Sequence, residues 1–442
     1  MRHAFLTVDL GFGDAGKGAV VDFLTRQYAA HTVVRYNGGA QAGHRVVLPG
    51  PDAREHVFSQ FGSGTLAGAA THLTRFMLIE PLAMLAEARH LRELGAGEPF
   101  ARTTIDARAL VITPFARAVN RLSELARGDA RHGSCGMGVG ETMIDYLAHG
   151  EQVLFAGDLA DRDVLYAKLR FLRTVNQAKL QRLALPDTAA VAAERAPLDD
   201  PAWAERLLDQ YRDWADLAQV VPGSHLHKLL RRPGAVVFEA AQGVLLDEWY
   251  GFHPHTTWST TTLANADRLL AEAGYDGGLT RVGITRAYAT RHGAGPLPSE
   301  DAALTAALPD AANRFGAWQQ GFRVGWLDLV LLRYALAVVG RLDTLALTCL
   351  DRLAGLPEPR ICRAYRDGEE PIERLPAVPG APSLAHQEQL TALLQRACPQ
   401  LAPLDGAGAL PALLAADLGL PVGLRSYGPS AADIGLVAGA GL

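Results

Sequence analysis

The first forty residues constrain the fold of this chain more than any other part of the sequence. A short apolar run at residues 4–10 is followed by a glycine-rich loop at residues 11–18. Helical spacing of apolar residues comes next, over residues 19–28, and then a β-branched run at residues 32–36. Strand, loop, helix and strand in this order form a βαβ unit, which predicts a parallel sheet with right-handed crossovers.

The rest of the sequence predicts more elements of the same class. The further strands are expected at residues 75–79, 236–239, 283–287 and 344–350, and the helices at residues 81–94, 114–126, 164–183, 328–339 and 385–397. We therefore expect an α/β fold: a large, mostly parallel sheet with helices on both faces and small β insertions. The sequence predicts a single domain over residues 1–442, with a helical insertion region at 160–235.

Composition excludes several classes of function. The formal net charge of -5 comes from well-mixed acids and bases, so no basic stripe points to a nucleic-acid partner. None of the four cysteines stands in a CxxC pair, which argues against a zinc site or a disulfide framework and favours a reducing compartment. No apolar stretch approaches the roughly 18 residues of a membrane span, so we expect a cytoplasmic protein with no membrane partner.

The loop at residues 11–18 fits the first seven positions of the phosphate-binding pattern G-x-x-x-x-G-K-[ST], and it has the strand-to-helix context that this pattern requires. Its backbone amides, the helix N-terminus and Lys17 would all attract phosphate. Gly18 stands where a Ser or Thr would hold Mg²⁺, and Asp14 places an acid inside the loop. Such an acid makes sense if it binds a metal or moves a proton. The alternative is a glycine-rich turn with a surface aspartate.

A second glycine-rich loop, residues 37–44, follows the strand at residues 32–36 and ends at His44. Because the carboxyl ends of parallel strands share one sheet edge, we expect Asp14 and His44 to lie close together. A carboxylate and an imidazole near a phosphate loop form a plausible base and acid pair. A lone histidine in a glycine turn is more often structural, and only its proximity to Asp14 favours the catalytic interpretation.

Eight motifs in order along the chain resemble those of the adenylosuccinate synthetases. They lie at residues 13–18, 35–39, 42–44, 238–247, 290–300, 325–328, 348–351 and 426–429. The resemblance implies a GTP-dependent ligase, with ATP left open as the donor. In that reaction the 6-oxygen of an IMP-like purine nucleotide is phosphorylated, and an amino acid, aspartate in the family, then displaces the phosphate to form a C–N bond. It also implies Mg²⁺ and a homodimer.

The resemblance further assigns residues. As catalytic groups it implies Asp14 as the base, His44 as the acid, Lys17 and Gln242, with Asp14 and the backbone of Gly43 binding Mg²⁺. The GTP-binding residues that it implies are Gly13, Gly16, Lys17, Gly18, Gly43, His44, Asp351 as the reader of guanine, Ser426 and Gly428. The substrate-binding residues that it implies are Gln41, Ser134, Cys135, Gln242, Thr257 and Arg323. Residues 365–442 are expected to complete the nucleotide site.

The departures from the family pattern concentrate in substrate recognition. Gln320 and Phe322 stand at the two positions where arginines would clamp the carboxylates of the amino acid, and only Arg323 remains. Gln41 replaces an asparagine, and Cys349 replaces a lysine. Two alternatives therefore stay open. The first is a paralogue of the same chemistry that uses another nucleotide or amine donor, and the second is a non-catalytic nucleotide-binding protein.

Overall fold

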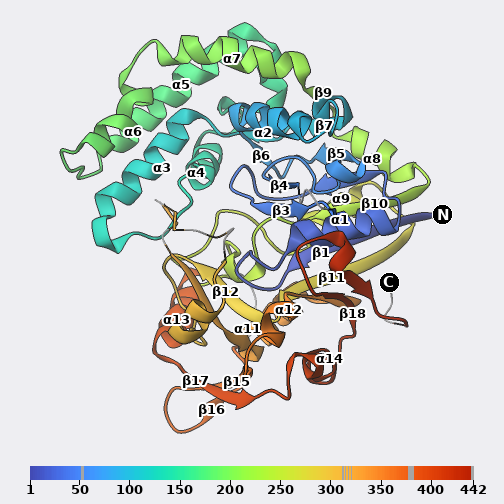
Figure 1. The fold of residues 1–442 in the computed structure, drawn as a ribbon. Coiled ribbons are helices and arrows are strands. Elements are labelled where there is room, and N and C mark those ends of the chain that lie inside the picture. The colour runs from blue at the N-terminus through green and yellow to red at the C-terminus, as the bar shows by residue number, and fades with distance from the viewer. Residues whose placement is uncertain are drawn as a thin grey trace.

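A ten-stranded sheet forms the centre of the computed structural model, which describes residues 1–50, 54–310, 313, 315–316, 318–319, 321–376 and 383–439 (Figure 1). Its strand order is β19 (Ile434–Leu436), β18 (Val422–Ser426), β14 (Thr344–Thr348), β11 (Gly278–Arg286), β1 (Arg2–Asp9), β10 (Gly234–Glu239), β2 (Thr32–Arg35), β5 (Ala70–Leu73), β7 (Thr103–Asp106) and β9 (Gln219–Val221). Every neighbouring pair is parallel except β18 and β19. The predicted α/β class with a large, mostly parallel sheet is confirmed.

Strand β1 lies in the interior of the sheet, between β11 and β10, and both of its faces are buried. Ala4, Leu6 and Val8 point into one hydrophobic core, and Phe5 points into another on the opposite face. For this reason, the sequences of parallel strands that are covered by helices on both faces are continuous apolar runs. Helix α1 (Lys17–Gln27) covers the face of Phe5, while α9 (Ala264–Glu272) and α11 (Leu329–Val339) belong to the core on the other face.

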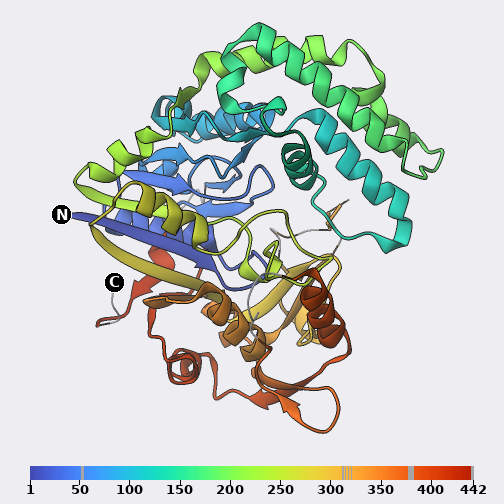
Figure 2. The same ribbon diagram turned by 180° about the vertical axis from the view of Figure 1, so that it is seen from behind.

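The helices between residues 81 and 217 gather at one end of the molecule (Figure 2). They are α2 (Pro81–Glu93), α3 (Pro114–Arg127), α4 (Val139–His149), α5 (Arg162–Leu180), α6 (Ala189–Asp199) and α7 (Trp203–Leu217), whereas α8 (Ser224–Arg231) packs Leu226 and Leu230 into the core of the large sheet. Helix α3 contacts α4, α5 and α6, and these helices bury a core of their own around Tyr211 and Trp214. The predicted division of the chain into regions stays a prediction.

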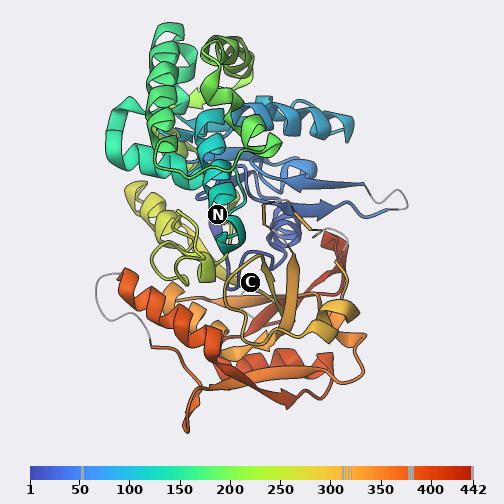
Figure 3. The ribbon, with the colours of Figure 1, turned by 90° about the vertical axis from the view of Figure 1, so that its left-hand side faces the viewer.

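A smaller sheet lies at the opposite end of the molecule (Figure 3). It contains β12 (Tyr288–His292), β13 (Phe322–Asp328), β15 (Arg360–Arg366), β16 (Pro371–Ile372) and β17 (Cys398–Pro403). The remaining helices are α10 (Ala302–Ala307), α12 (Leu350–Ala354), α13 (Leu384–Arg396) and α14 (Leu410–Leu418), and the remaining short strands are β3 (His44–Val47), β4 (Glu55–Phe58), β6 (Leu78–Ile79) and β8 (Leu110–Val111). In the described part of the chain, no helix is both long and apolar enough to cross a membrane.

One prediction about the secondary structure is confirmed only in part, and one is wrong. Of the strand predicted at residues 75–79, only Leu78 and Ile79 form a strand, β6, whereas the nearby strand of the large sheet, β5, ends at Leu73. Residues 219–221, predicted as helical, form the edge strand β9 because the pair Val220 and Val221 extends beside β7. The other predicted strands and helices overlap observed elements.

Candidate active site

The glycine loop between β1 and α1 folds around Asp9, the last residue of β1. The carboxylate of Asp9 accepts hydrogen bonds from the backbone nitrogens of Gly11, at 2.8 Å, and Ala15, at 3.0 Å. It also forms a 2.7 Å ion pair with Nζ of Lys17, and the two side chains of that pair are 0% and 1% exposed. Lys17 therefore lies directly under the loop, neutralised by an acid that sequence analysis did not single out.

Gly18 shows why the usual Ser or Thr is missing from the loop. A Cβ atom at this position would lie 2.5 Å from the backbone oxygen of Arg45 and 2.8 Å from the carbonyl carbon of His44. No side chain fits in that space, because both neighbouring atoms belong to the backbone. The absence of a Cβ thus allows the second predicted loop to pack directly against the first.

His44 lies at the start of β3 and is bound to Glu239, the last residue of β10. Its Nδ1 is 2.6 Å from Oε1 of Glu239. The hydroxyl of Ser63 donates to the same oxygen, and the backbone nitrogen of Ser63 donates to Oε2 at 2.9 Å. Burial lowers the pKa of His44 to about 4. Burial also acts to raise the pKa of Glu239, but Arg35, His44 and Ser63 outweigh it and lower that pKa to about 2. At neutral pH a neutral imidazole therefore donates from Nδ1 and leaves Nε2 buried with no partner.

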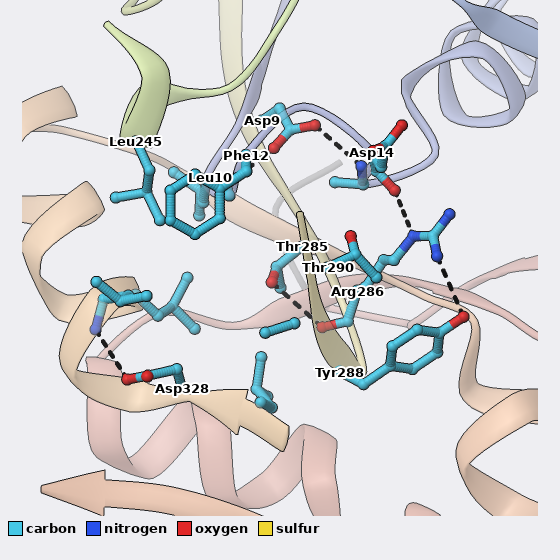
Figure 4. A pocket seen from close by; sticks show the side chains of 16 residues that line it. Asp9, Leu10, Phe12, Asp14, Leu245, Thr285, Arg286, Tyr288, Thr290 and Asp328 are labelled. Atoms are coloured by element: carbon cyan, nitrogen blue, oxygen red, sulfur yellow. Dashed lines mark hydrogen bonds between the residues drawn. The ribbon is translucent and has the colours of Figure 1, made fainter. Parts of the chain in front are cut away.

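Asp14 is partly exposed and has partners of its own. Its Oδ2 lies 3.3 Å from Nε2 of His292 on β12, and its backbone oxygen accepts a hydrogen bond from Arg286 at the end of β11. A pocket beneath the loop brings Asp9, Asp14, Arg286 and Tyr288 together (Figure 4). Asp14 and His44 thus lie on loops at the same sheet edge, with no hydrogen bond between them in the described residues, and their roles as base and acid stay a prediction.

The residues expected to bind the nucleotide acceptor meet beside the loop. Nε2 of Gln242 donates to Oγ1 of Thr257 at 2.7 Å, and Gly13 packs against the backbone of Gln242. Both side-chain amide atoms of Gln41 are buried and have no hydrogen-bond partner in the described part of the chain. Buried polar groups are normally hydrogen-bonded, so the unpaired amide of Gln41 marks a position where a bound ligand would supply partners.

The residues expected to read the guanine lie on the other side of the glycine loop. Strands β14 and β18 are parallel neighbours, so Asp351 and the pair Ser426 and Gly428 follow adjacent strand ends. Asp351 is exposed in the first turn of α12, and the hydroxyl of Ser426 donates to the backbone oxygen of Gly428 at 2.9 Å. Gly16 packs against Thr348, which links the glycine loop to this end of the site.

The region expected to bind the amino acid offers few free cations. Arg323 forms a 2.6 Å ion pair with Glu300 and donates to the backbone oxygen of Gly295 at 2.7 Å. Phe322 packs its ring against His292, with 4.9 Å between the ring centroids. Gln320 lies outside the described residues. No arginine at these positions is free to clamp a second carboxylate in the described structure.

Ser134 and Cys135 lie on the segment before α4. The hydroxyl of Ser134 accepts a 2.9 Å hydrogen bond from Nδ2 of Asn120 on α3. Burial raises the pKa of the Cys135 thiol, so this side chain stays a neutral thiol at neutral pH. Arg121, also on α3, donates to the backbone oxygen of Gly136 at 2.9 Å and therefore brings a guanidinium next to this segment.

Residues 7–393 of the chain match the family model of adenylosuccinate synthetase. The chain belongs to the adenylosuccinate synthetase family. It is 34% identical over 387 residues to the adenylosuccinate synthetase of Desulfovibrio desulfuricans, with 85% of each chain covered. It is 36% identical over 376 residues to that of Desulforudis audaxviator, with 83% of this chain and 81% of the relative covered. The chain is therefore an enzyme of the ligase type that defines this family.

Solved structures of the family share the fold. The fully ligated adenylosuccinate synthetase from Plasmodium falciparum superposes with a TM-score of 0.76 at 18% identity, and the match covers 98% of this chain and 99% of that one. Cyanophage S-2L succinoaminodeoxyadenylate synthetase (PurZ), bound to dGMP and dATP, gives a TM-score of 0.60 at 16% identity, covering 100% of this chain and 97% of that one. At these identities the likeness concerns the fold alone.

The ion pair beneath the glycine loop leads to a prediction about stability. Replacement of Asp9 by alanine leaves the buried ammonium of Lys17 without its partner, so Asp9→Ala should lower the free energy of unfolding by about 3–5 kcal/mol. Urea denaturation measures this change. The matched control is Asp199→Ala, which breaks the exposed pair Arg195–Asp199 and should cost less than about 1 kcal/mol. Equal losses in the two variants would contradict the importance of the buried pair.

Proposed function

We propose that this enzyme uses GTP to phosphorylate the 6-oxygen of an IMP-like purine nucleotide and then joins the purine to an amino acid, aspartate as in its family. The observation that carries this proposal is the position of Asp14. Its carboxylate is 23% exposed at the rim of a loop whose lysine is already neutralised by a different acid, Asp9. Because Asp9 forms the ion pair with Lys17, the carboxylate of Asp14 is available to act as a base.

The chemistry follows from this arrangement. Asp14 takes the proton from N1 of the 6-oxopurine, and the resulting oxyanion attacks the γ-phosphorus of GTP while the bond to the β-phosphate oxygen breaks. The 6-oxygen then leaves as phosphate when the amine attacks C6, because phosphorylation turns a poor leaving group into a good one. Gln242 and Thr257 hold the acceptor beside the loop, and Asp351 with Ser426 and Gly428 receives the guanine.

The residues present fit Mg²⁺. In the described part of the chain, no cluster of three or more His, Cys, Asp or Glu side chains is placed to hold a metal ion. Mg²⁺ is often bound by only one or two carboxylates together with substrate phosphates and water. The partly exposed carboxylate of Asp14 and the exposed backbone of Gly43 provide such oxygen ligands at the mouth of the loop. The ion would neutralise charge on the transferred phosphoryl group.

A second candidate function is the same chemistry with a different amine donor or nucleotide. It is favoured by the phenyl ring of Phe322 at an expected arginine position and by the ion pair that occupies Arg323. An amine with fewer carboxylates than aspartate would need fewer cations. ATP in place of GTP is a further variant, which the exposed carboxylate of Asp351 disfavours because it matches the N1 and N2 donors of guanine.

We also propose that the enzyme works in the cytoplasm as a homodimer. All four of its cysteines are free, as expected in a reducing compartment. Helix α4 exposes Ile144, Tyr146 and Leu147 at 36%, 37% and 67%. Helix α4 comes shortly after Ser134 and Cys135 in the chain. A second subunit that covers these apolar side chains would therefore lie close to the proposed acceptor site. Sedimentation at micromolar concentration should show a dimer, and a monomer would contradict this proposal.

Phosphate release from GTP tests the proposed function. Purified enzyme with Mg²⁺ should release phosphate only when an acceptor from the set IMP, GMP and dGMP is present together with an amine. Turnover with IMP and aspartate on the order of 1–10 per second would support the first candidate. Turnover with another pair would establish the second, and nucleotide binding without any release would mean a non-catalytic binding protein. Asp14→Asn should lower turnover at least about 10³-fold, since it removes the base.

The state of His44 predicts a proton linkage. In the free enzyme its lowered pKa leaves Nε2 unprotonated, whereas donation from Nε2 to a phosphate oxygen requires a second ring proton. GTP binding at pH 7 should therefore take up about one proton, and affinity should fall as pH rises, by up to about tenfold per pH unit. Calorimetric titration in two buffers of different ionisation enthalpy measures the uptake. The control is His44→Gln, which donates without an added proton; equal enthalpies for the unmodified enzyme in both buffers would contradict the linkage.

A further inference from the structure

Asp14 belongs to a closed ring of polar contacts that involves five residues. On one side its carboxylate lies 3.3 Å from Nε2 of His292, which lies 3.1 Å from Oδ1 of Asn313. Nδ2 of Asn313 donates to Oδ2 of Asp310 at 3.0 Å. The same carboxylate oxygen of Asp310 is 3.5 Å from Nη2 of Arg286, whose Nε donates to the backbone oxygen of Asp14 and closes the ring. The ring thus holds Asp14 at both its side chain and its backbone.

The proton on the ring of His292 can be placed from its neighbours. Nε2 faces two acceptors, the carboxylate oxygen of Asp14 and the amide oxygen of Asn313, whose own nitrogen is turned toward Asp310. Because the amide oxygen of Asn313 can only accept, this hydrogen bond assigns the ring hydrogen to Nε2, with the carboxylate oxygen of Asp14 3.3 Å away. The other ring nitrogen, Nδ1, is buried and has no partner in the described residues.

A rigid support holds the imidazole in place. His292 is the last residue of β12 and is paired directly with Phe322, the first residue of β13. The two rings pack at 4.9 Å with an interplanar angle of 54°, and the guanidinium of Arg286 lies 5.8 Å from the ring of Phe322 on another side. Side chains fixed on paired strands are positioned more accurately than side chains on loops.

We propose that His292 is a positioning residue for Asp14: its Nε2 contacts one carboxylate oxygen at 3.3 Å and, through the hydrogen bond to Asn313, connects the base to Asn313 and Asp310. This proposal rests on the proposed function, since it takes Asp14 as the base. Because this contact is at Oδ2, we expect Oδ1 to receive the proton from the acceptor nucleotide. Asn313 precedes Phe322 and Arg323 by only nine and ten positions in the chain, so this contact brings the region expected to bind the amine donor toward the carboxylate that starts the reaction.

Two substitutions at one position test this role. His292→Leu removes the donor, and His292→Gln keeps an N–H at the same distance from the backbone. His292→Leu should lower kcat about 10²-fold and leave the KM values for GTP and acceptor within about twofold, because a misplaced base slows chemistry more than binding. His292→Gln should recover most of that loss. The proposal is overturned if His292→Leu keeps full kcat, or if His292→Gln is as defective as His292→Leu.

A measurement without turnover separates this proposal from the proposed function. In ¹⁵N-labelled enzyme, the ring nitrogens of His292, assigned by their loss in His292→Leu, should show the Nε2–H tautomer. Asp14→Asn should shift these signals, while those of the distant, buried His72 should stay unchanged. This outcome does not depend on which substrates the enzyme uses. An Nδ1–H tautomer, or signals that do not respond to Asp14→Asn, would overturn the proposal even in an active enzyme.

Discussion

The buried ion pair between Asp9 and Lys17 is the interaction on which the site depends. It ends β1, organises the backbone nitrogens of the glycine loop and fixes the start of α1, all through one carboxylate. A buried pair of this kind is retained when its geometry is good and its remaining hydrogen bonds are satisfied, as they are here. Because Asp9 fulfils this structural role, the second acid of the loop, Asp14, is left for the reaction.

The order of the strands in the sheet determines where the other candidate site residues lie. On one side of β1, the end of β10 supplies Glu239 and Gln242, and through Glu239 it orients His44 from the neighbouring loop. On the other side, β11, β14 and β18 end at the positions that face the proposed guanine site. The residues proposed for the acceptor and those proposed for the donor thus flank the glycine loop, as a direct transfer between two bound nucleotides would require.

The sequence was informative where local rules decide the structure. The βαβ opening follows from the spacing of its apolar residues, and the glycine loop follows from its motif. The partner of Asp14 could not be predicted in the same way, because His292 reaches it from a strand about 280 residues away. The acid at the end of an apolar strand, seen in both Asp9 and Glu239, was the available signal for the residues that were missed. The short strand β9 was missed because its three residues stand among helical patterns.

Because Lys17 is already paired with Asp9, the loop should discriminate between the anions that could bind to it. A lysine that already neutralises Asp9 gains little from a single weakly held anion, so inorganic phosphate at millimolar concentration competes poorly for the loop. A triphosphate that also engages the guanine side brings enough additional binding energy to draw Lys17 away from its partner. The internal ion pair therefore lowers the apparent affinity of every ligand that must break it by the same factor, and a ligand that makes many further contacts still binds tightly after this loss.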